Sequence, residues 1–262
     1  MIKRVNGKDF FSAPHGRAVW TAVLLVIFFA APVRPNHTVN EDTFIRILRA
    51  EDERRYDHAL LALLSHQNVE VRRRAALAAG RIGDAAALRP LMTLLANDSE
   101  PDVRATAAFA LGEIESTEAV EALTEALHRA GETAPIRARS VEALGKIAAA
   151  NLTSGDQARV LPLVSEIERV LEQEGPAGER EVALAALTAS LRARMIDAGP
   201  TIAALLTHRD ERVRSDAANT LARLRVKNVN TQLEAALADA GPVVRANVAQ
   251  ALGRAGDHAA YN

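Results

Sequence analysis

The stretch VRRRAALAAGRI (residues 71–82) decides the fold because close copies of it recur along the chain. The further copies are VRATAAFALGEI (103–114), IRARSVEALGKI (136–147), EREVALAALTAS (179–190), VRSDAANTLARL (213–224) and VRANVAQALGRA (244–255). Arginine is the second residue of every copy, and the steps between these arginines are 32, 33, 43, 34 and 31 residues. Self-similarity at such a period indicates a solenoid, in which one helical unit stacks on the next.

Each period predicts two helices. An apolar segment with helical spacing comes first, as in AALRPLMTLLAND (86–98), and a break with a helix-start signal follows, as in Ser99-Glu100-Pro101. The motif is the second helix, and its first, fifth, sixth, ninth and twelfth positions are mostly apolar. Glycine recurs at its tenth position, where it costs about 1 kcal/mol relative to alanine. We therefore expect an all-α chain in which the next repeat's backbone approaches this glycine closely.

The composition agrees with helices that lie close together. Aromatic residues make up 3% of the 262 residues, so alanine and leucine must fill the core. The formal net charge is −1, which gives no long-range attraction for nucleic acid. The chain has no cysteine, which excludes disulfides, thiol nucleophiles and zinc–thiolate sites.

Residues 1–33 are predicted to be an export signal or a membrane anchor. Lys3, Arg4, Lys8 and Arg17 precede the uncharged run AVWTAVLLVIFFAA (18–31). At about 1.5 Å per residue this run is shorter than a hydrocarbon core of roughly 30 Å. We expect a protein that is exported to the periplasm or cell envelope, or tethered to the inner membrane by an uncleaved N-terminal segment. Membrane contact is expected only through residues 18–33.

Residues 34–50 are predicted to be a linker and a capping helix (NEDTFIRILR, 40–49), and residues 51–262 the solenoid. The third step is about ten residues longer than the others, which predicts a loop over residues 151–156 and a longer first helix over Gln157–Glu174. At the C-terminus, GRAGDHAAYN (253–262) restarts the pattern of GRIGDAAALR (80–89). Residues 257–262 are either the truncated start of another repeat, or a partner covers the last groove.

The alternation of paired helices with the motif VR..A..ALG resembles the HEAT-repeat family, in the short form known as lyase-type HEAT-like repeats, over residues 51–257. It is also similar to the HEAT arrays of bacterial envelope proteins. The resemblance implies a right-handed α-solenoid of about six helix pairs. It further implies a ladder between repeats, formed by an Asp at the inter-helix turn and the Arg six residues later. Asp98 with Arg104 and Asp239 with Arg245 match that pattern.

The arginine column is accordingly assigned to this structural ladder. Its members are Arg72, Arg104, Arg137, Arg180, Arg214 and Arg245. The other equivalent turn positions hold His66, Gly131, Glu174 and His208. Because three of these residues cannot act as a carboxylate, we expect the ladder to be incomplete.

No catalytic, cofactor or metal site is predicted. HExxH, GxSxG, GxxxxGKS and GxGxxG patterns do not occur, and none of the seven histidines lies beside a glutamate in the sequence. Deoxyhypusine hydroxylases, a related helical-repeat family, hold di-iron with His-Glu pairs, so their activity is not expected here. We expect a protein that is not an enzyme and that needs no cofactor.

The surface left for function is the concave one, lined by the second helices. Positions four and eleven of the motif share one helix face, and many of them are basic. The predicted basic ridge comprises Arg74, Arg81, Arg139, Lys146, Arg223 and Arg254, with Phe109 near its middle. Either this ridge is an ordinary solvated face, or it binds an acidic or extended peptide by charge complementarity.

The sequence is therefore interpreted as a non-catalytic scaffold in the cell envelope that presents a concave face to another protein or an extended peptide. Two alternatives stay open. The chain is the regulatory or chaperone-like arm of an envelope peptidyl-prolyl isomerase whose catalytic domain is absent here. Or it is a lyase-type HEAT-like enzyme that acts on a tetrapyrrole-bearing protein.

Overall fold

The structure, a computed structural model, describes residues 41–153 and 157–256. The chain divides into Met1–His37 and Thr38–Asn262, and all described residues belong to the second unit. These residues form helices and turns and contain no strand. The predicted signal or anchor over residues 1–33 and the predicted repeat start over residues 257–262 lie outside the described residues. No helix within the described ranges is long and apolar enough to cross a membrane.

Six helix pairs follow the single helix α1 (Glu41–Asp52) in the described residues. The first helices of the pairs are α2 (His58–Leu63), α4 (Leu88–Asn97), α6 (Val120–His128), α8 (Gln157–Glu174), α10 (Gly199–Ala204) and α12 (Asn230–Ala236). The second helices are α3 (Val69–Ile82), α5 (Pro101–Ile114), α7 (Ala134–Thr153), α9 (Arg180–Arg192), α11 (Glu211–Leu224) and α13 (Pro242–Ala255). Short 3₁₀ turns, η1 (Ala85–Ala87), η2 (Thr117–Ala119) and η3 (Leu205–Thr207), flank three of the first helices.

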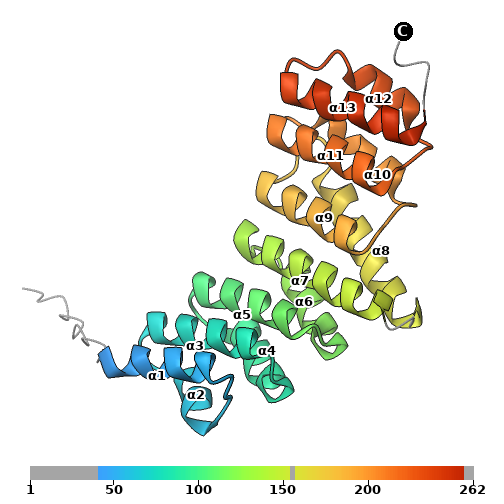
Figure 1. Cartoon of the computed structure of the whole chain (residues 1–262). Coiled ribbons are helices and arrows are strands. Elements are labelled where there is room, and N and C mark those ends of the chain that lie inside the picture. The colour runs from blue at the N-terminus through green and yellow to red at the C-terminus, as the bar shows by residue number, and fades with distance from the viewer. Residues whose placement is uncertain (1–40, 154–156, 257–262) are drawn as a thin grey trace, which may run out of the picture. The chain divides into compact units, whose positions relative to one another are not determined.

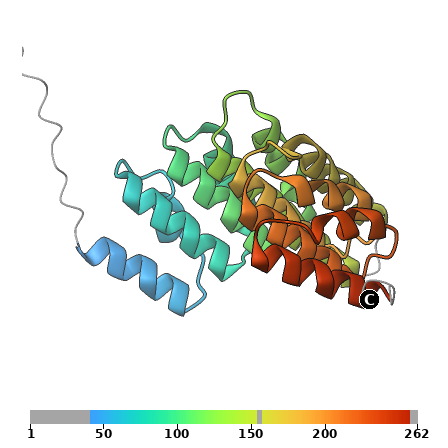
Figure 2. The same ribbon diagram turned by 90° about the horizontal axis from the view of Figure 1, so that it is seen from above.

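The pairs stack in sequence order, so that the second helices form one row and the first helices another (Figures 1 and 2). Each second helix contacts the second helix of the next pair, from α3 to α13, and α1 packs against α3 at the start of the row. The structure is thus an α-solenoid, in which every inner repeat buries its apolar surface against its neighbours.

Local signals start the second helices where the sequence predicts them. The side chain of Asn68 accepts a hydrogen bond from the backbone N–H of Val71, and the side chain of Asp210 accepts one from that of Val213. Pro101 begins α5 and Pro242 begins α13. A proline is tolerated in the first turn because the backbone N–H that it lacks has no partner within the helix.

Small residues allow the backbones of successive second helices to meet. A Cβ on Gly80 would lie 2.5 Å from the Cα of Ala110, and one on Gly112 would lie 2.8 Å from the Cα of Ala143. Such distances are far below van der Waals contact, so only glycine fits at these two positions. The expected close approach of the neighbouring backbone is confirmed, and each glycine packs on the eighth residue of the following motif.

The fourth motif begins three residues later than the sequence alignment placed it. Gly145 packs on Ala189, whose Cα would lie 2.5 Å from a Cβ on Gly145. If Ala189 is the eighth residue, as the two preceding contacts require, the motif spans residues 182–193 and begins with the buried Val182. Thr188, the tenth residue of the copy at 179–190, is then not the replacement for the recurrent glycine, and the tenth position is Leu191.

The backbone at the helix ends supports the same register. The residue after the motif has a positive φ following α3, α5, α11 and α13, at Gly83, Glu115, Arg225 and Gly256. Arg194, with φ 51°, falls into this series only when the motif of α9 ends at residue 193. Arg180 therefore stands outside the motif, and Ala183 occupies the arginine column. The alignment failed because Arg180 completes the arginine series, whereas packing follows the buried apolar residues.

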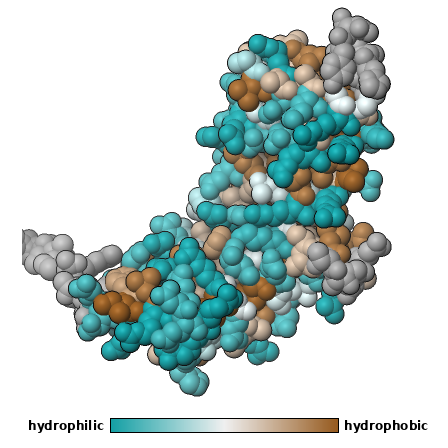
Figure 3. All heavy atoms as spheres, viewed as in Figure 1, coloured by the Kyte–Doolittle hydropathy of each residue, from teal (hydrophilic) through white to brown (hydrophobic). Residues whose placement is uncertain are grey.

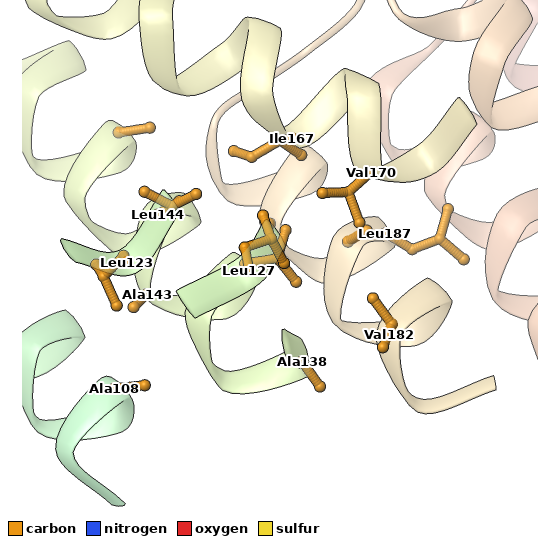
Figure 4. Close-up of a cluster of buried hydrophobic side chains, with 14 of the residues drawn as sticks. Ala108, Leu123, Leu127, Ala138, Ala143, Leu144, Ile167, Val170, Val182 and Leu187 are labelled. Atoms are coloured by element: carbon orange, nitrogen blue, oxygen red, sulfur yellow. The ribbon is translucent and has the colours of Figure 1, made fainter. Parts of the chain in front are cut away.

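The hydrophobic core runs between the two rows of helices. In Figure 4, Leu123 and Leu127 of α6 approach Leu144 of α7, and Ile167 of α8 lies toward Leu187 of α9. These side chains are 4% exposed or less. Aliphatic side chains from neighbouring pairs thus fill the interior, as the low aromatic content predicts.

The long third step has a different cause from the one predicted. The predicted helix Gln157–Glu174 is confirmed as α8, but residues 151–153 belong to α7, which runs on to Thr153. The extra residues therefore lengthen α7 and α8 instead of forming a loop from residue 151.

We expect Gly145→Ala to destabilise the solenoid although alanine is the better helix former. The added methyl group would enter the backbone of α9, and overpacking of this kind costs about 1–3 kcal/mol. Urea unfolding should show a lower midpoint than for the wild-type chain. Thr188→Ala, at an exposed position of α9, is the control, because it also places an alanine in a second helix; it should leave the midpoint unchanged or raise it slightly. Equal effects of both variants would contradict the close approach.

Candidate functional site

The arginine column ties each turn to the next repeat. Arg72 donates through Nη1 to the carbonyl oxygens of His66 and Gln67, in the turn before its own helix. Its Nε and Nη2 donate to both carboxylate oxygens of Asp98 at 2.7 and 2.9 Å, in the turn of the following repeat. Arg104 in turn donates to the carbonyl oxygen of Asp98 at 2.8 Å. Arg104 therefore contacts Asp98 through a backbone carbonyl oxygen, whereas the carboxylate of Asp98 pairs with Arg72 of the preceding repeat.

The same arrangement continues along the stack. Arg214 pairs with Asp239 as Arg72 pairs with Asp98, with contacts of 2.6 and 3.0 Å. Where the turn lacks an aspartate, a glutamate nearby provides the carboxylate. The pairs of this kind are Arg104 with Glu132 and Arg137 with Glu174. The prediction of an incomplete ladder was wrong at the turn of Gly131, because the neighbouring Glu132 supplies the carboxylate there. Glu174 is itself one of the equivalent turn positions and pairs as a carboxylate there can.

The junction of α9 with α11 is the weak step of the ladder. Arg180 lies 3.4 Å from the carboxylate of Asp210, but its side chain is 62% exposed and, unlike Arg72, donates to no turn carbonyl oxygen within the described residues. Such an exposed pair contributes little to stability. Contacts between α9 and α11 are also the least extensive among consecutive second helices, where Leu191 replaces the recurrent glycine. In α13, the last second helix of the described residues, Arg245 donates among these residues to the carbonyl oxygens of Asp239 and Ala240 alone.

Two histidines take the place of aspartate within the turns. The Nδ1 of His66 accepts from the backbone N–H of Asn68, and that of His208 accepts from the N–H of Asp210, both at 3.0 Å. The Asp239 carboxylate accepts from the N–H of Gly241 in the same way. These histidines are turn residues, as the sequence predicts.

The ladder lowers the pKa values of its carboxylates. Burial alone raises the pKa of Asp98 and of Glu132, but the paired guanidinium groups outweigh this effect and hold both pKa values below their ordinary range. For Asp239 the hydrogen bond from Arg214 is the largest effect, and its pKa is also lowered. A lowered pKa in the folded state stabilises the fold above the ordinary carboxyl pKa, and this stabilisation is lost as the pH falls through the lowered value.

We expect Asp98→Asn and Asp239→Asn each to lower the free energy of unfolding at pH 7 by about 1.5–3 kcal/mol, the contribution of a hydrogen bond to a charged group. The difference from wild type should shrink on acidification below about pH 4, where the wild-type carboxylates also become protonated. Denaturant unfolding between pH 7 and pH 3 measures both effects. Asp197→Asn, in an exposed turn outside the ladder, is the matched control and should change neither value. A pH-independent loss would contradict the electrostatic account.

The exposed face of the second helices carries the residues predicted to form the basic ridge. Hydrophilic side chains cover most of this face in Figure 3, with apolar groups between them. Arg74 and Arg81 of α3 both contact Glu51 of α1, at 2.9 and 2.7 Å. The carboxylate of Glu51 is thus shared by two arginines, so the capping helix offsets part of their positive charge, and Arg81 stays half exposed.

The middle of the face is a network around Glu142 of α7. Glu142 contacts Arg139 at 2.8 Å, Arg192 at 3.3 Å and Lys146 at 3.6 Å. Burial alone raises the pKa of Glu142, but Lys146 and the two arginines together lower it below its ordinary range. Lys146 also contacts Glu113 of α5 and lies 4.2 Å from the centre of the Phe109 ring. The network fixes these side chains and leaves little free positive charge.

Beside Phe109 the face is hollowed. An open hollow of about 360 Å³ spans α3, α5, α7 and α9. We call it the Phe109 hollow. Its apolar lining comes from Leu77, Ala105, Phe109 and Pro135, and its charged rim from Arg73, Asp102, Arg139 and Glu181. Two cations and two anions balance at the rim, so the hollow suits a neutral or mixed-charge segment with an apolar side chain.

The C-terminal part of the face differs from the rest. Arg223 and Arg254, at the eleventh position of α11 and α13, are exposed and have no ion pair or side-chain hydrogen bond within the described residues. In the corrected register Arg192 holds this position in α9. The sequence alignment missed Arg192 because it placed the buried Val182 and Ala189 on the face. The sequence does not show that Arg194 and Arg225 have positive φ values. It does show that Arg194 follows Arg192 by the same two residues as Arg225 follows Arg223, and this spacing indicates the correct register.

The described residues hold no group of three or more His, Asp or Glu side chains that could bind a metal ion. One histidine does meet a glutamate in space, since His128 of α6 contacts Glu166 of α8. Glu166 also pairs with Arg169, which lies one turn further along α8. This cluster joins two first helices and lies outside the second-helix face.

The repeat signature is recognised along most of the chain. The model for HEAT repeats matches residues 43–103, 56–145, 88–188 and 198–262. The chain belongs to the HEAT-repeat family. No curated protein matches its sequence.

Solved structures share the fold of this HEAT-repeat protein at low sequence identity. YibA of Escherichia coli is 19% identical, with a TM-score of 0.60 over 82% of this chain and 75% of that chain. A computationally designed armadillo repeat protein for modular peptide recognition is 19% identical, with a TM-score of 0.50 over 74% of this chain and 98% of that chain. The complex of CpcE and CpcF of phycocyanin lyase from Nostoc is 22% identical, with a TM-score of 0.49 over 74% and 75%. These similarities concern the fold alone.

Proposed function

We propose that this HEAT-repeat protein is a non-catalytic scaffold that binds a segment of another protein on the face of its second helices. The Phe109 hollow is the observation that carries the proposal, because it combines an apolar floor with a charged rim on a face that hydrophilic side chains mostly cover. Apolar anchors that enter such depressions supply most of the energy of many protein interfaces. Recognition of peptides by a designed repeat protein of the same fold class is consistent with this function.

The surroundings of the hollow favour binding without rearrangement. Lys146 and Arg139 lie 4.2 and 5.5 Å from the centre of the Phe109 ring, and both are held by glutamates. Side chains that are already fixed lose little conformational entropy when a partner binds. The rim holds both cations and anions, so it can pair with acidic as well as basic side chains of the partner. Selectivity then comes from the shape of the hollow and from the order of charges along the partner.

The cellular location that we propose rests on the sequence. The proposal places the protein in the cell envelope, exported or tethered through residues 18–33, because of the basic and apolar pattern of its N-terminus. The right-handed sense of the solenoid and the concavity of the binding face are part of the same expectation. The isomerase-arm and bilin-lyase alternatives have no specific support from the described residues.

We expect Phe109→Ala to weaken the binding of ligand peptides by about tenfold or more, because it removes the aromatic wall that the partner's apolar side chain would contact. The ligands are peptides selected from a random display library on the full wild-type chain, and their affinities are measured by fluorescence anisotropy. Phe109 is only half-buried and lies on the surface of the stack, so circular dichroism should show an unchanged helix content.

Leu161→Ala is the matched control for Phe109→Ala. Leu161 is 64% exposed on α8, a first helix, so its removal also deletes an exposed apolar side chain but from another surface. Selected peptides should bind this variant as tightly as wild type. If they bind Phe109→Ala with wild-type affinity, or depend on Leu161 instead, the second-helix face is not the binding site.

A further inference from the structure

We infer that the C-terminal ends of α9, α11 and α13 form a second subsite, which takes an extended acidic segment of the bound protein. The subsite, here called the basic edge, comprises Arg192, Arg194, Arg223, Arg225, Lys227 and Arg254. The inference rests on the proposed function and deepens it. It proposes that acidic residues of the bound protein lie on a part of the face that the Phe109 hollow does not reach.

The basic edge stands out because the chain pairs its cations almost everywhere else. Most described arginines contact a carboxylate or a backbone carbonyl oxygen, in the ladder or on the face. The described arginines and lysines with no such contact are Arg46, Arg49, Arg89, Arg194, Arg223, Arg225, Lys227 and Arg254. More than half of them belong to the basic edge, and the sixth member, Arg192, has one contact of 3.3 Å.

The stack brings these cations together. Helices α9, α11 and α13 are consecutive in the row and run in the same direction (Figures 1 and 2). Arg192, Arg223 and Arg254 hold the same motif position, so they repeat at the distance between packed helices, about 8–10 Å. An extended chain advances about 3.3 Å per residue. A carboxylate at every third residue of the partner would therefore meet one arginine per repeat.

Amide side chains next to these arginines could bind the backbone of a peptide. Asn219 and Gln250 lie one helical turn before Arg223 and Arg254, on the same face. Neither amide has a side-chain hydrogen bond within the described residues. Free amide groups can donate to and accept from peptide groups, whereas a lipid surface offers no such regular pattern. An acidic peptide thus fits the edge better than an anionic membrane does.

Two members of the edge occupy backbone positions that favour glycine. Arg194 and Arg225 have φ values of 51° and 55°, and the equivalent positions after α3 and α13 hold Gly83 and Gly256. Arginine is less favourable than glycine in this left-handed conformation. Glu115 takes the same position after α5, so a charged residue is tolerated there. Unlike Glu115, Arg194 and Arg225 both add positive charge to the basic edge, and neither has an ion-pair partner within the described residues.

The test uses a fluorescein-labelled peptide that repeats Glu-Ser-Ala and the full-length protein. The wild-type chain should bind it, with an affinity that falls as salt rises, and should not bind the Lys-Ser-Ala counterpart. A peptide of the same composition with its glutamates in one block should bind more weakly. The triple variant Arg223→Gln, Arg225→Gln, Arg254→Gln should lose about tenfold or more in affinity.

The matched control removes the same charge from elsewhere. Arg46→Gln, Arg49→Gln, Arg89→Gln takes away three unpaired, exposed arginines of α1 and α4. It should bind the Glu-Ser-Ala peptide as wild type does, which excludes an effect of net charge alone. The double variant Arg194→Gly, Arg225→Gly should weaken binding while leaving the thermal unfolding midpoint unchanged or raised. A purely structural role of these arginines predicts a lower midpoint.

Three results would overturn the inference. They are equal affinities for the two triple variants, no binding of the Glu-Ser-Ala peptide by wild type, and tighter binding of phosphatidylserine vesicles or single-stranded DNA with the same arginine dependence. The proposed function fails separately. If library peptides ignore Phe109 while the Glu-Ser-Ala peptide needs the basic edge, only the hollow is wrong. If library peptides need Phe109 and the two triple variants behave alike, only the edge is wrong.

Discussion

The close approach of neighbouring second helices is the constraint on which the rest of the structure depends. Gly80, Gly112 and Gly145 each bring a helix backbone against an alanine of the next helix. At such short range, few side chains fit between the helices of the row, and the larger aliphatic residues fill the space between the two rows. The glycines cost helix propensity, and the packing that they permit compensates for this cost. The motif is repeated because every repeat must present the same narrow surface to its neighbour.

Electrostatic pairing follows from this stacking. Once the turns lie side by side, an arginine at the start of one second helix reaches a carboxylate in the next turn. The same proximity pairs Arg74 with α1 and Lys146 with α5. Consequently the stack uses most of its own positive charge internally. Among the described residues, the cations that remain unpaired are concentrated where three helices end together, and this distribution separates the basic edge from the Phe109 hollow.

The helical repeat could be predicted from the sequence because residues close together in the chain determine it. The arginine spacing, the apolar periodicity and the helix-start signals placed the pairs, and α8 was predicted with its observed bounds. The register of α9 was missed because Arg180 satisfied the sequence pattern, while the packing depends on Val182 and Ala189. Burial against a neighbour is a property of the folded stack, and a single repeat does not reveal it.

The candidate site was predictable only in part. Positions four and eleven share one side of the second helices other than α9, but several of their side chains, such as Arg74 and Lys146, are largely buried by neighbouring helices. Their partners were not predicted, since Arg81 with Glu51 and Arg192 with Glu142 are joined across 30 and 50 residues. A count of basic residues therefore overestimated the positive charge of the N-terminal half of the face.

The central claim is that consecutive second helices stack side by side, with their motifs in one common register. It is tested most directly by a distance between two spin labels, which the cysteine-free chain allows at Arg192→Cys and Arg254→Cys. Stacking in this register predicts one narrow distance distribution near 20 Å, twice the separation of packed helices, broadened only by the label linkers. A broad distribution, or a maximum beyond about 30 Å, would contradict the account.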